Sequence, residues 1–178
     1  MTVERTVVQD MVRASFPDDV PVPELLLKFA EWEEASGLFL PGQLEFTPHG
    51  RREAREWADG DEQNATQFVI FLIGEAHSNY GYWLYGGRPL DEAPLVYLDS
   101  EAADSTVLAN TLAEFVALVA LGAPNLGLYR LSDEDVEPDE ETLQFRDWLK
   151  AETGIEAPTD AEARAIIGKA RAQHPDLE

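Results

Sequence analysis

The sequence predicts an α+β domain in which a mostly antiparallel sheet, connected as a meander, is flanked by helices. Short β-rich runs, separated by Gly, Asn, Pro and Asp turn residues, occupy residues 67–108. The connections between these runs are only a few residues long, and such short connections join antiparallel neighbours. A capped amphipathic helix follows directly over residues 111–122. These three observations favour one sheet with helices laid against it.

The N-terminal region, residues 3–36, predicts two helices. Residues 3–15 carry four apolar side chains at helical spacing, and Pro17 ends that run because proline cannot continue the hydrogen-bond ladder. A second helix is expected over residues 23–36, with Gly37 as its C-terminal cap.

The sheet core is expected within residues 43–122. Residues 43–47 alternate polar and apolar, which is typical of a half-buried strand. Residues 68–73 are apolar at both parities, so we expect a strand that is covered on both faces and is central in the sheet. The remaining predictions are a short helix or loop at 51–58, a polar connector at 59–65, and strands at 80–85, 95–98 and 106–108.

The end of the sheet leads into three more predicted helices. Thr111 and Glu114 fit a capping box at the start of the first, and Gly122 can end it. The C-terminal region, residues 138–175, predicts a helix over 139–151 with Pro138 in its first turn, and a last helix over 160–173. We expect residues 1–178 to form a single domain, which at this size buries roughly 70% of the unfolded chain's surface.

Composition narrows the class of protein. Cysteine is absent, which removes disulfides, thiolate zinc sites and cysteine nucleophiles and fits a reducing compartment. No apolar run approaches the roughly 18 residues of a membrane span, and the N-terminus lacks a basic segment followed by an apolar one. We therefore expect a cytoplasmic protein with no membrane partner.

The charge is strongly negative. The chain has 13 Lys and Arg residues against 35 Asp and Glu residues, which gives a net charge of −22. Such a surface repels nucleic acid and anionic membranes and attracts cationic proteins. The alternative is that the acidity serves only solubility.

No cofactor, metal or catalytic motif emerges. A calcium loop that began at Asp133 would need a glycine and a carboxylate where Pro138 and Gln144 stand. Acidic residues at this position fit the first turn of a helix better, because they complement its dipole. The three histidines lie in turns or the tail and are predicted to be surface residues, and neither a nucleophile elbow nor a phosphate loop occurs. With so many acids, pairs of carboxylates carry no evidence for acid–base catalysis, so the chain is predicted not to be an enzyme.

Aromatic residues cluster on adjacent predicted strands. Alternation along each strand predicts that about half of them lie in the core, and the rest are candidates for interface anchors beside carboxylates. The cluster comprises Tyr80, Tyr82, Trp83, Tyr85 and Tyr97.

Several segments together resemble the SUKH superfamily. Phe71-Leu-Ile-Gly74 followed by Tyr80-Gly-Tyr-Trp-Leu84 is similar to the family's strand core, and Pro94–Ser100 and Val107–Phe115 are similar to its next strands and the helix that follows. Pro23–Phe29 matches an early helix of the family. The chain lacks the family's early Leu-Pro…Tyr and Asn-Gly-Gly signatures, so it resembles a divergent member.

The resemblance implies an α+β fold and a non-enzymatic role, and it supplies no catalytic residues. Many bacterial members look to be immunity proteins that neutralise a cognate toxin domain, often a nuclease, and fungal members regulate cell-wall synthesis. The hypothesis is therefore an acidic immunity protein that binds a basic toxin domain, with Glu75, Tyr80, Asp99 and Glu101 as candidate contact residues. The alternative is a regulatory or scaffold module of a cellular pathway.

Overall fold

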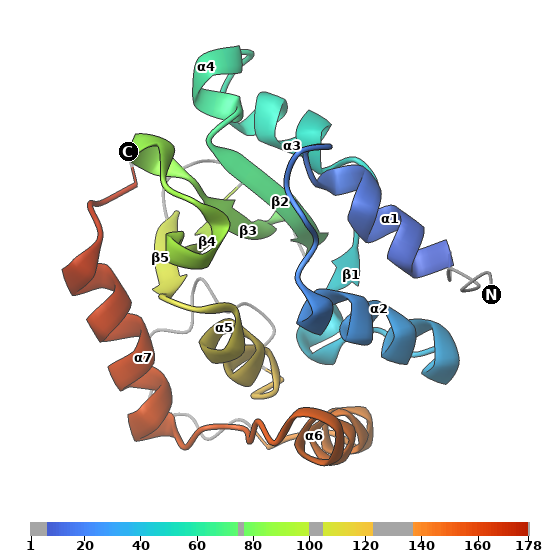
Figure 1. Ribbon diagram of the computed structural model, residues 1–178. Helices are drawn as coiled ribbons and strands as arrows, with labels where there is room; N and C mark the ends of the chain where they lie inside the picture. The colour runs from blue at the N-terminus through green and yellow to red at the C-terminus, as the bar shows by residue number, and fades with distance from the viewer. Residues whose placement is uncertain (1–6, 75–76, 100–104, 123–136, 178) are drawn as a thin grey trace.

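A sheet lies between two groups of helices in this α+β chain (Figure 1). The computed structural model describes residues 7–74, 77–99, 105–122 and 137–177. Its helices are α1 Val7–Ser15, α2 Glu24–Ser36, α3 Gly50–Trp57, α4 Glu62–Ala65, α5 Leu112–Val119, α6 Glu140–Thr153 and α7 Asp160–Gln173. Its strands are β1 Glu45–Phe46, β2 Phe68–Ile73, β3 Asn79–Trp83, β4 Leu95–Leu98 and β5 Thr106–Ala109.

The five strands pair in sequence order, β1-β2-β3-β4-β5, and every pair is antiparallel. The predicted meander is therefore confirmed. The strand over Phe68–Ile73 has a neighbour on each side, as its uninterrupted apolar run predicted, and its first five residues are buried.

Both faces of the sheet are covered. The larger core lies on one face and takes side chains from α1, α2, α5 and α6, with Phe29, Phe115 and Phe145 among its fully buried residues. The smaller core lies on the other face, where α3 and α4 cover Ile70 and Trp83. Strands β2 and β3 carry apolar side chains on both faces of the sheet. A helical layer on only one face would therefore expose the apolar side chains of the other face to water.

A β-bulge in β2 changes which face its side chains reach. Ile70 pairs with Gly81 and Leu72 pairs with Tyr80, which leaves Phe71 as an additional residue in the strand. Phe71 and Leu72 consequently both belong to the larger core, although they are adjacent in sequence. A bulge of this kind breaks the simple alternation on which strand predictions rest.

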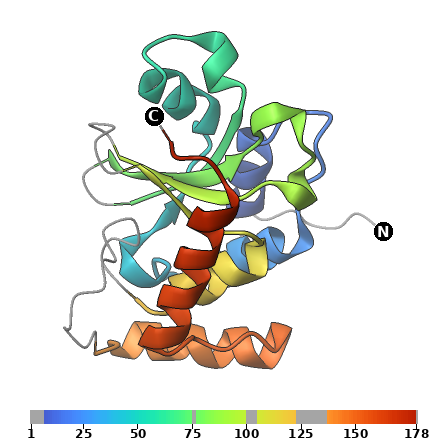
Figure 2. The ribbon, with the colours of Figure 1, turned by 90° about the vertical axis from the view of Figure 1, so that its left-hand side faces the viewer.

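Helix α7 covers the edge of the sheet. It packs along β5, the last strand, and Figure 2 shows it running past that edge. Ala163 and Ile167 join the larger core and Ala170 joins the smaller one, so the helix bridges both layers. Docking of this helix covers a sheet edge that would otherwise offer unpaired backbone groups to other chains.

Several predicted helix ends were correct and others were wrong. Gly37 caps α2 in the left-handed conformation, as predicted. The Thr111 hydroxyl accepts the Glu114 N–H, but Glu114 accepts the N–H of Asn110 instead of that of Thr111, so only half of the predicted capping box forms. A complete box instead begins α7, between Thr159 and Glu162.

Two short segments also differ from their predictions. Pro138 was expected in the first turn of α6, but Asp139 is the N-cap and the proline precedes it. The polar connector at 59–65 contains the short helix α4, because the Asp61 carboxylate accepts the N–H groups of Gln63 and Asn64. In the described part of the chain, no helix is long and apolar enough to cross a membrane.

The pairing of β2 with β3 yields a test. A Cβ added at Gly81 would lie 2.1 Å from the Val69 carbonyl oxygen, which is a backbone atom that cannot move aside cheaply. We expect Gly81→Ala to destabilise the protein by roughly 3 kcal/mol, the upper end of overpacking costs. Urea unfolding would measure it.

The matched control is Gly168→Ala in α7, where an added Cβ meets nothing within 4 Å. Alanine favours a helix interior over glycine, so this variant should gain roughly 0.5–1 kcal/mol. If the two variants unfold at the same urea concentration, either β2 does not approach β3 closely at Gly81 or α7 is not helical at Gly168.

Candidate functional site

Only two of the four predicted contact residues, Tyr80 and Asp99, lie in the part of the chain that the structure describes. Glu75 and Glu101 lie outside the described residues. Asp99 is half-buried at the end of β4, and its N–H donates to the Ser105 hydroxyl over 3.0 Å. Tyr80 is fully buried, with its ring centroid 5.4 Å from that of Tyr97, so its predicted role as an anchor for a partner is wrong.

The other clustered aromatics are buried for the same reason. Tyr82, Trp83 and Tyr97 are each less than a tenth exposed, because helices cover both faces of the sheet. Tyr85 is the one member of the cluster that is partly exposed. The expectation that half of these rings remain available as interface anchors is therefore wrong.

One predicted surface histidine belongs to a polar network. The Tyr85 hydroxyl lies 2.7 Å from His174 Nδ1, and His174 Nε2 lies 2.8 Å from Asn110 Oδ1. Since the amide oxygen can only accept, Nε2 carries the proton and Nδ1 accepts the tyrosine O–H. Burial, and then the positive charge of Arg88, lower the pKa of His174, which favours this neutral form. His49 and His77 are exposed, as predicted.

The network ties the end of α7 to the loop after β3. The Arg88 guanidinium stacks 3.7 Å from the centroid of the Tyr85 ring, and its Nε donates to the Tyr85 carbonyl. Asn110 also donates through Nδ2 to Gln173. A tyrosine hydroxyl that is hydrogen-bonded to an imidazole can belong to a catalytic site. The same contacts also hold the C-terminal helix against the sheet, and this structural role accounts for them.

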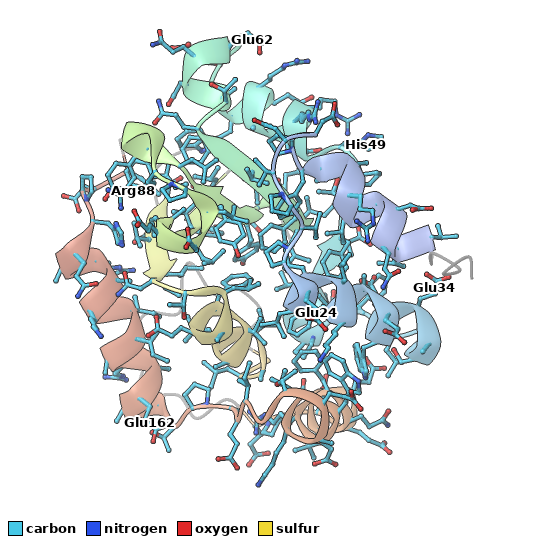
Figure 3. The ribbon with its side chains drawn as sticks, in the orientation of Figure 1. Glu24, Glu34, His49, Glu62, Arg88 and Glu162 are labelled. Atoms are coloured by element: carbon cyan, nitrogen blue, oxygen red, sulfur yellow. The ribbon has the colours of Figure 1, made fainter. Side chains whose placement is uncertain are left out.

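A mainly apolar hollow, which Asn110 of this network also lines, is called here the Val20–Leu112 groove. Its volume is about 630 Å³. Three segments form its walls: residues 19–23 between α1 and α2, residues 89–93 before β4, and residues 110–112 at the start of α5. In Figure 3, Glu24 and Arg88 mark the chain positions that flank two of these walls.

The groove walls are mainly apolar and partly rigid. Proline fixes its own backbone angle, so the three wall prolines limit how far the walls can move. The apolar lining residues are Val20, Pro21, Val22, Pro23, Pro89, Leu90, Ala93 and Leu112. Pockets for small ligands and peptide side chains are commonly of this size and composition.

Tyr82 contributes a buried polar group to the groove. Its ring packs in the larger core, with centroids 5.8 Å from Phe71 and 6.4 Å from Phe16, and its side chain lines the groove. Its hydroxyl makes no hydrogen bond with any residue that the structure describes. Burial raises the pKa of this hydroxyl above its ordinary value, so it stays a neutral donor.

Two exposed carboxylates, Asp19 and Asp91, line the groove from two different wall segments. Neither forms an ion pair within the described ranges, and no Lys, Arg or His is among the described lining residues. A second hollow of about 500 Å³ beside α3 differs in this respect. There Arg51 pairs with Asp18 over 3.7 Å, and Arg55 pairs with Glu62 over 2.8 Å. The carboxylates of the groove therefore remain free to meet an external cation.

Sequence reasoning missed this groove. The sequence predicts neither a helix nor a strand over residues 19–22 and 86–91. The signal was present in Val20-Pro-Val-Pro23 and Pro89-Leu90, which place apolar residues in turn segments that have no strand or helix period. Which of these segments meet in space depends on the tertiary fold.

The described residues contain no group of three or more His, Asp or Glu side chains arranged to hold a metal ion. Comparison of the chain with family models, with curated proteins and with solved structures gives no match. The resemblance to the SUKH superfamily accordingly stays a prediction.

Glu33 is the carboxylate whose pKa the fold changes most clearly. Burial, followed by the charge of Glu45, raises its pKa from 4.5 to about 7, although the Phe46 N–H donates a hydrogen bond to it. One of its oxygens is buried and has no hydrogen-bond partner among the described residues. Neither Glu33 nor Glu45 lines the Val20–Leu112 groove or the hollow beside α3.

Glu33 gives a pH-dependent stability test. Because its folded pKa is raised, the protonated form favours folding, and stability is lost as the pH rises from about 4.5 through 7. Glu33→Gln should therefore stabilise the protein at pH 8 by about 1 kcal/mol, a value discounted for partial exposure, and by less at pH 5.

The measurement is urea unfolding at both pH values. Glu31→Gln is the control, since Glu31 is exposed on the same helix and should leave both midpoints unchanged. A Glu33→Gln effect equal at pH 5 and pH 8 would contradict the raised pKa.

Proposed function

We propose that this chain is a non-enzymatic, acidic binding protein, and that it acts as an immunity protein that neutralises a basic toxin domain, such as a nuclease. The target is another protein whose surface is rich in Lys and Arg. Neutralisation means that the chain occupies the surface with which the toxin would hold its own substrate.

The excess of carboxylates carries the proposal. Even if each of the 13 basic residues paired with one acidic residue, 35 − 13 = 22 carboxylates would stay without a basic partner. A surplus of this size destabilises a compact chain through self-repulsion and is relieved when a cationic surface docks on it.

The charge is displayed on ordered structure. Figure 3 shows the labelled Glu24, Glu34, Glu62 and Glu162 on α2, α4 and α7, and such acids continue along other helices. Carboxylates fixed on helices can stand where the phosphates of a nucleic acid would lie in a nuclease cleft. An unstructured acidic tail would first lose conformational entropy to do the same.

The architecture supports the same proposal. An antiparallel sheet flanked by helices is the fold that the resemblance to SUKH proteins implies, and immunity is the role that the resemblance implies for bacterial members. Fold alone does not fix function, so the charge remains the main argument.

The proposal predicts a salt-dependent complex. Proteins encoded beside this chain would be co-expressed and co-purified with it, and the affinity of the resulting pair would be measured from 50 to 500 mM NaCl. Affinity should fall at least about tenfold across this range, because the Debye length shrinks and the charges are screened.

A growth assay supplies the functional half of the test. Cells that express the partner should stop growing, and co-expression of this chain should restore growth. The immunity proposal would be contradicted if the partner is acidic, if the affinity does not depend on salt, or if the partner is harmless to cells. A harmless partner that binds with salt-dependent affinity would favour a regulatory module.

A further inference from the structure

We infer that the Val20–Leu112 groove binds an extended segment of a basic protein in which an apolar side chain is flanked by Lys or Arg. The inference rests on the proposed function, since the segment would belong to the cationic partner. It goes beyond that function by naming the surface and the side-chain chemistry that it recognises.

The apolar walls call for an apolar side chain. Eight of the lining residues are Val, Pro, Leu or Ala, and a groove of about 630 Å³ has room for a few side chains. Water against such walls is displaced favourably, at about 25 cal/mol for each Å² of apolar surface that is covered. The three wall prolines restrict the backbone of the walls, so less conformational freedom is lost on binding.

The two carboxylates of the groove favour positive charge on either side of that apolar side chain. Asp19 and Asp91 project from different walls, are exposed, and make no ion pair inside the described part of the molecule. Successive side chains of an extended segment alternate in direction, so a central apolar residue can enter the groove while its neighbours reach the rim. Charge-assisted hydrogen bonds between these neighbours and the two carboxylates would then form.

The floor supplies one directional contact. The Tyr82 side chain is 3% exposed, lines the groove, and has no hydrogen-bond partner for its hydroxyl among the described residues. The hydroxyl can donate a hydrogen bond to a carbonyl oxygen of the bound segment. An acidic segment would meet Asp19 and Asp91 with like charge, which argues against it.

The probes are three fluorescein-labelled hexapeptides, measured by fluorescence anisotropy. The first alternates Lys and Leu, the second alternates Lys and Ser, and the third alternates Glu and Leu. We expect the Lys/Leu peptide to bind at least tenfold more tightly than either of the others. Equal binding of the Lys/Leu and Lys/Ser peptides would show non-specific charge attraction and overturn the inference, as would the absence of binding at millimolar peptide.

Variants place the binding in the groove. The double variant Asp19→Asn/Asp91→Asn should weaken Lys/Leu binding about tenfold and flatten its salt dependence, and Leu90→Lys should abolish it by filling and charging the wall. The matched control removes two exposed carboxylates elsewhere, Glu31→Gln/Asp176→Asn, and should bind as the original chain does. Equal weakening by both double variants would overturn the assignment.

Tyr82→Phe separates binding from stability. It should weaken Lys/Leu binding by two- to tenfold while leaving the urea midpoint unchanged or higher, because no described residue forms a hydrogen bond with the hydroxyl that it removes. Unchanged binding with a lower midpoint would show that the hydroxyl serves the fold instead.

The proposed function and the proposed groove can be refuted independently of each other. If the co-purified partner still binds the Asp19→Asn/Asp91→Asn and Leu90→Lys variants with full affinity, the groove is wrong and the acidic binding protein stands. If no basic partner exists but the Lys/Leu peptide binds in the groove, the immunity proposal is wrong and the recognition chemistry stands.

Discussion

The burial of β2 and β3 on both faces is the constraint on which the rest of this structure depends. The run Phe68–Ile73 sends apolar side chains to both sides of the sheet, and the bulge at Phe71 adds one more to the larger core. Each face then needs its own helical layer. Helices α1, α2, α5 and α6 supply one, and α3 and α4 supply the other. Helix α7 closes the edge at β5, where the two layers meet.

This arrangement explains why most of the clustered aromatic residues are buried. Helices cover both faces of the sheet, so Tyr80, Trp83 and Tyr97 are buried, and a binding surface must form outside the strands, on the helices or on the connections between elements. The Val20–Leu112 groove is built from three such connections. Tyr82 belongs to the larger core and also lines the groove, so the core and the groove share this side chain.

The fold affects individual carboxylates of this acidic chain in different ways. Carboxylates at helix starts have a local structural role, as Asp139 shows: hydrogen bonds from Thr142 lower the pKa of Asp139 and cap α6. Glu33 shows the opposite case, since burial and Glu45 raise its pKa and make its charge costly. The chain has 35 acidic residues against 13 basic ones, so at least 22 carboxylates have no basic residue of their own. Self-repulsion of this kind suits a protein that becomes more stable when a cationic partner binds.

The sequence alone determined the fold class, the strand order and most helix bounds. Unbroken apolarity over residues 68–73, short turns and helical spacing are local signals, and Asp160–Gln173 was predicted at the bounds that the structure shows. The half-formed box at Thr111, the bulge at Phe71 and the burial of Tyr80 were not predictable in this way, because each depends on what lies opposite a residue. Only the tertiary structure decided where the groove lies and which acids stand on it. Its walls are separated by many residues along the chain, and no local pattern reports which turns a packed sheet brings together.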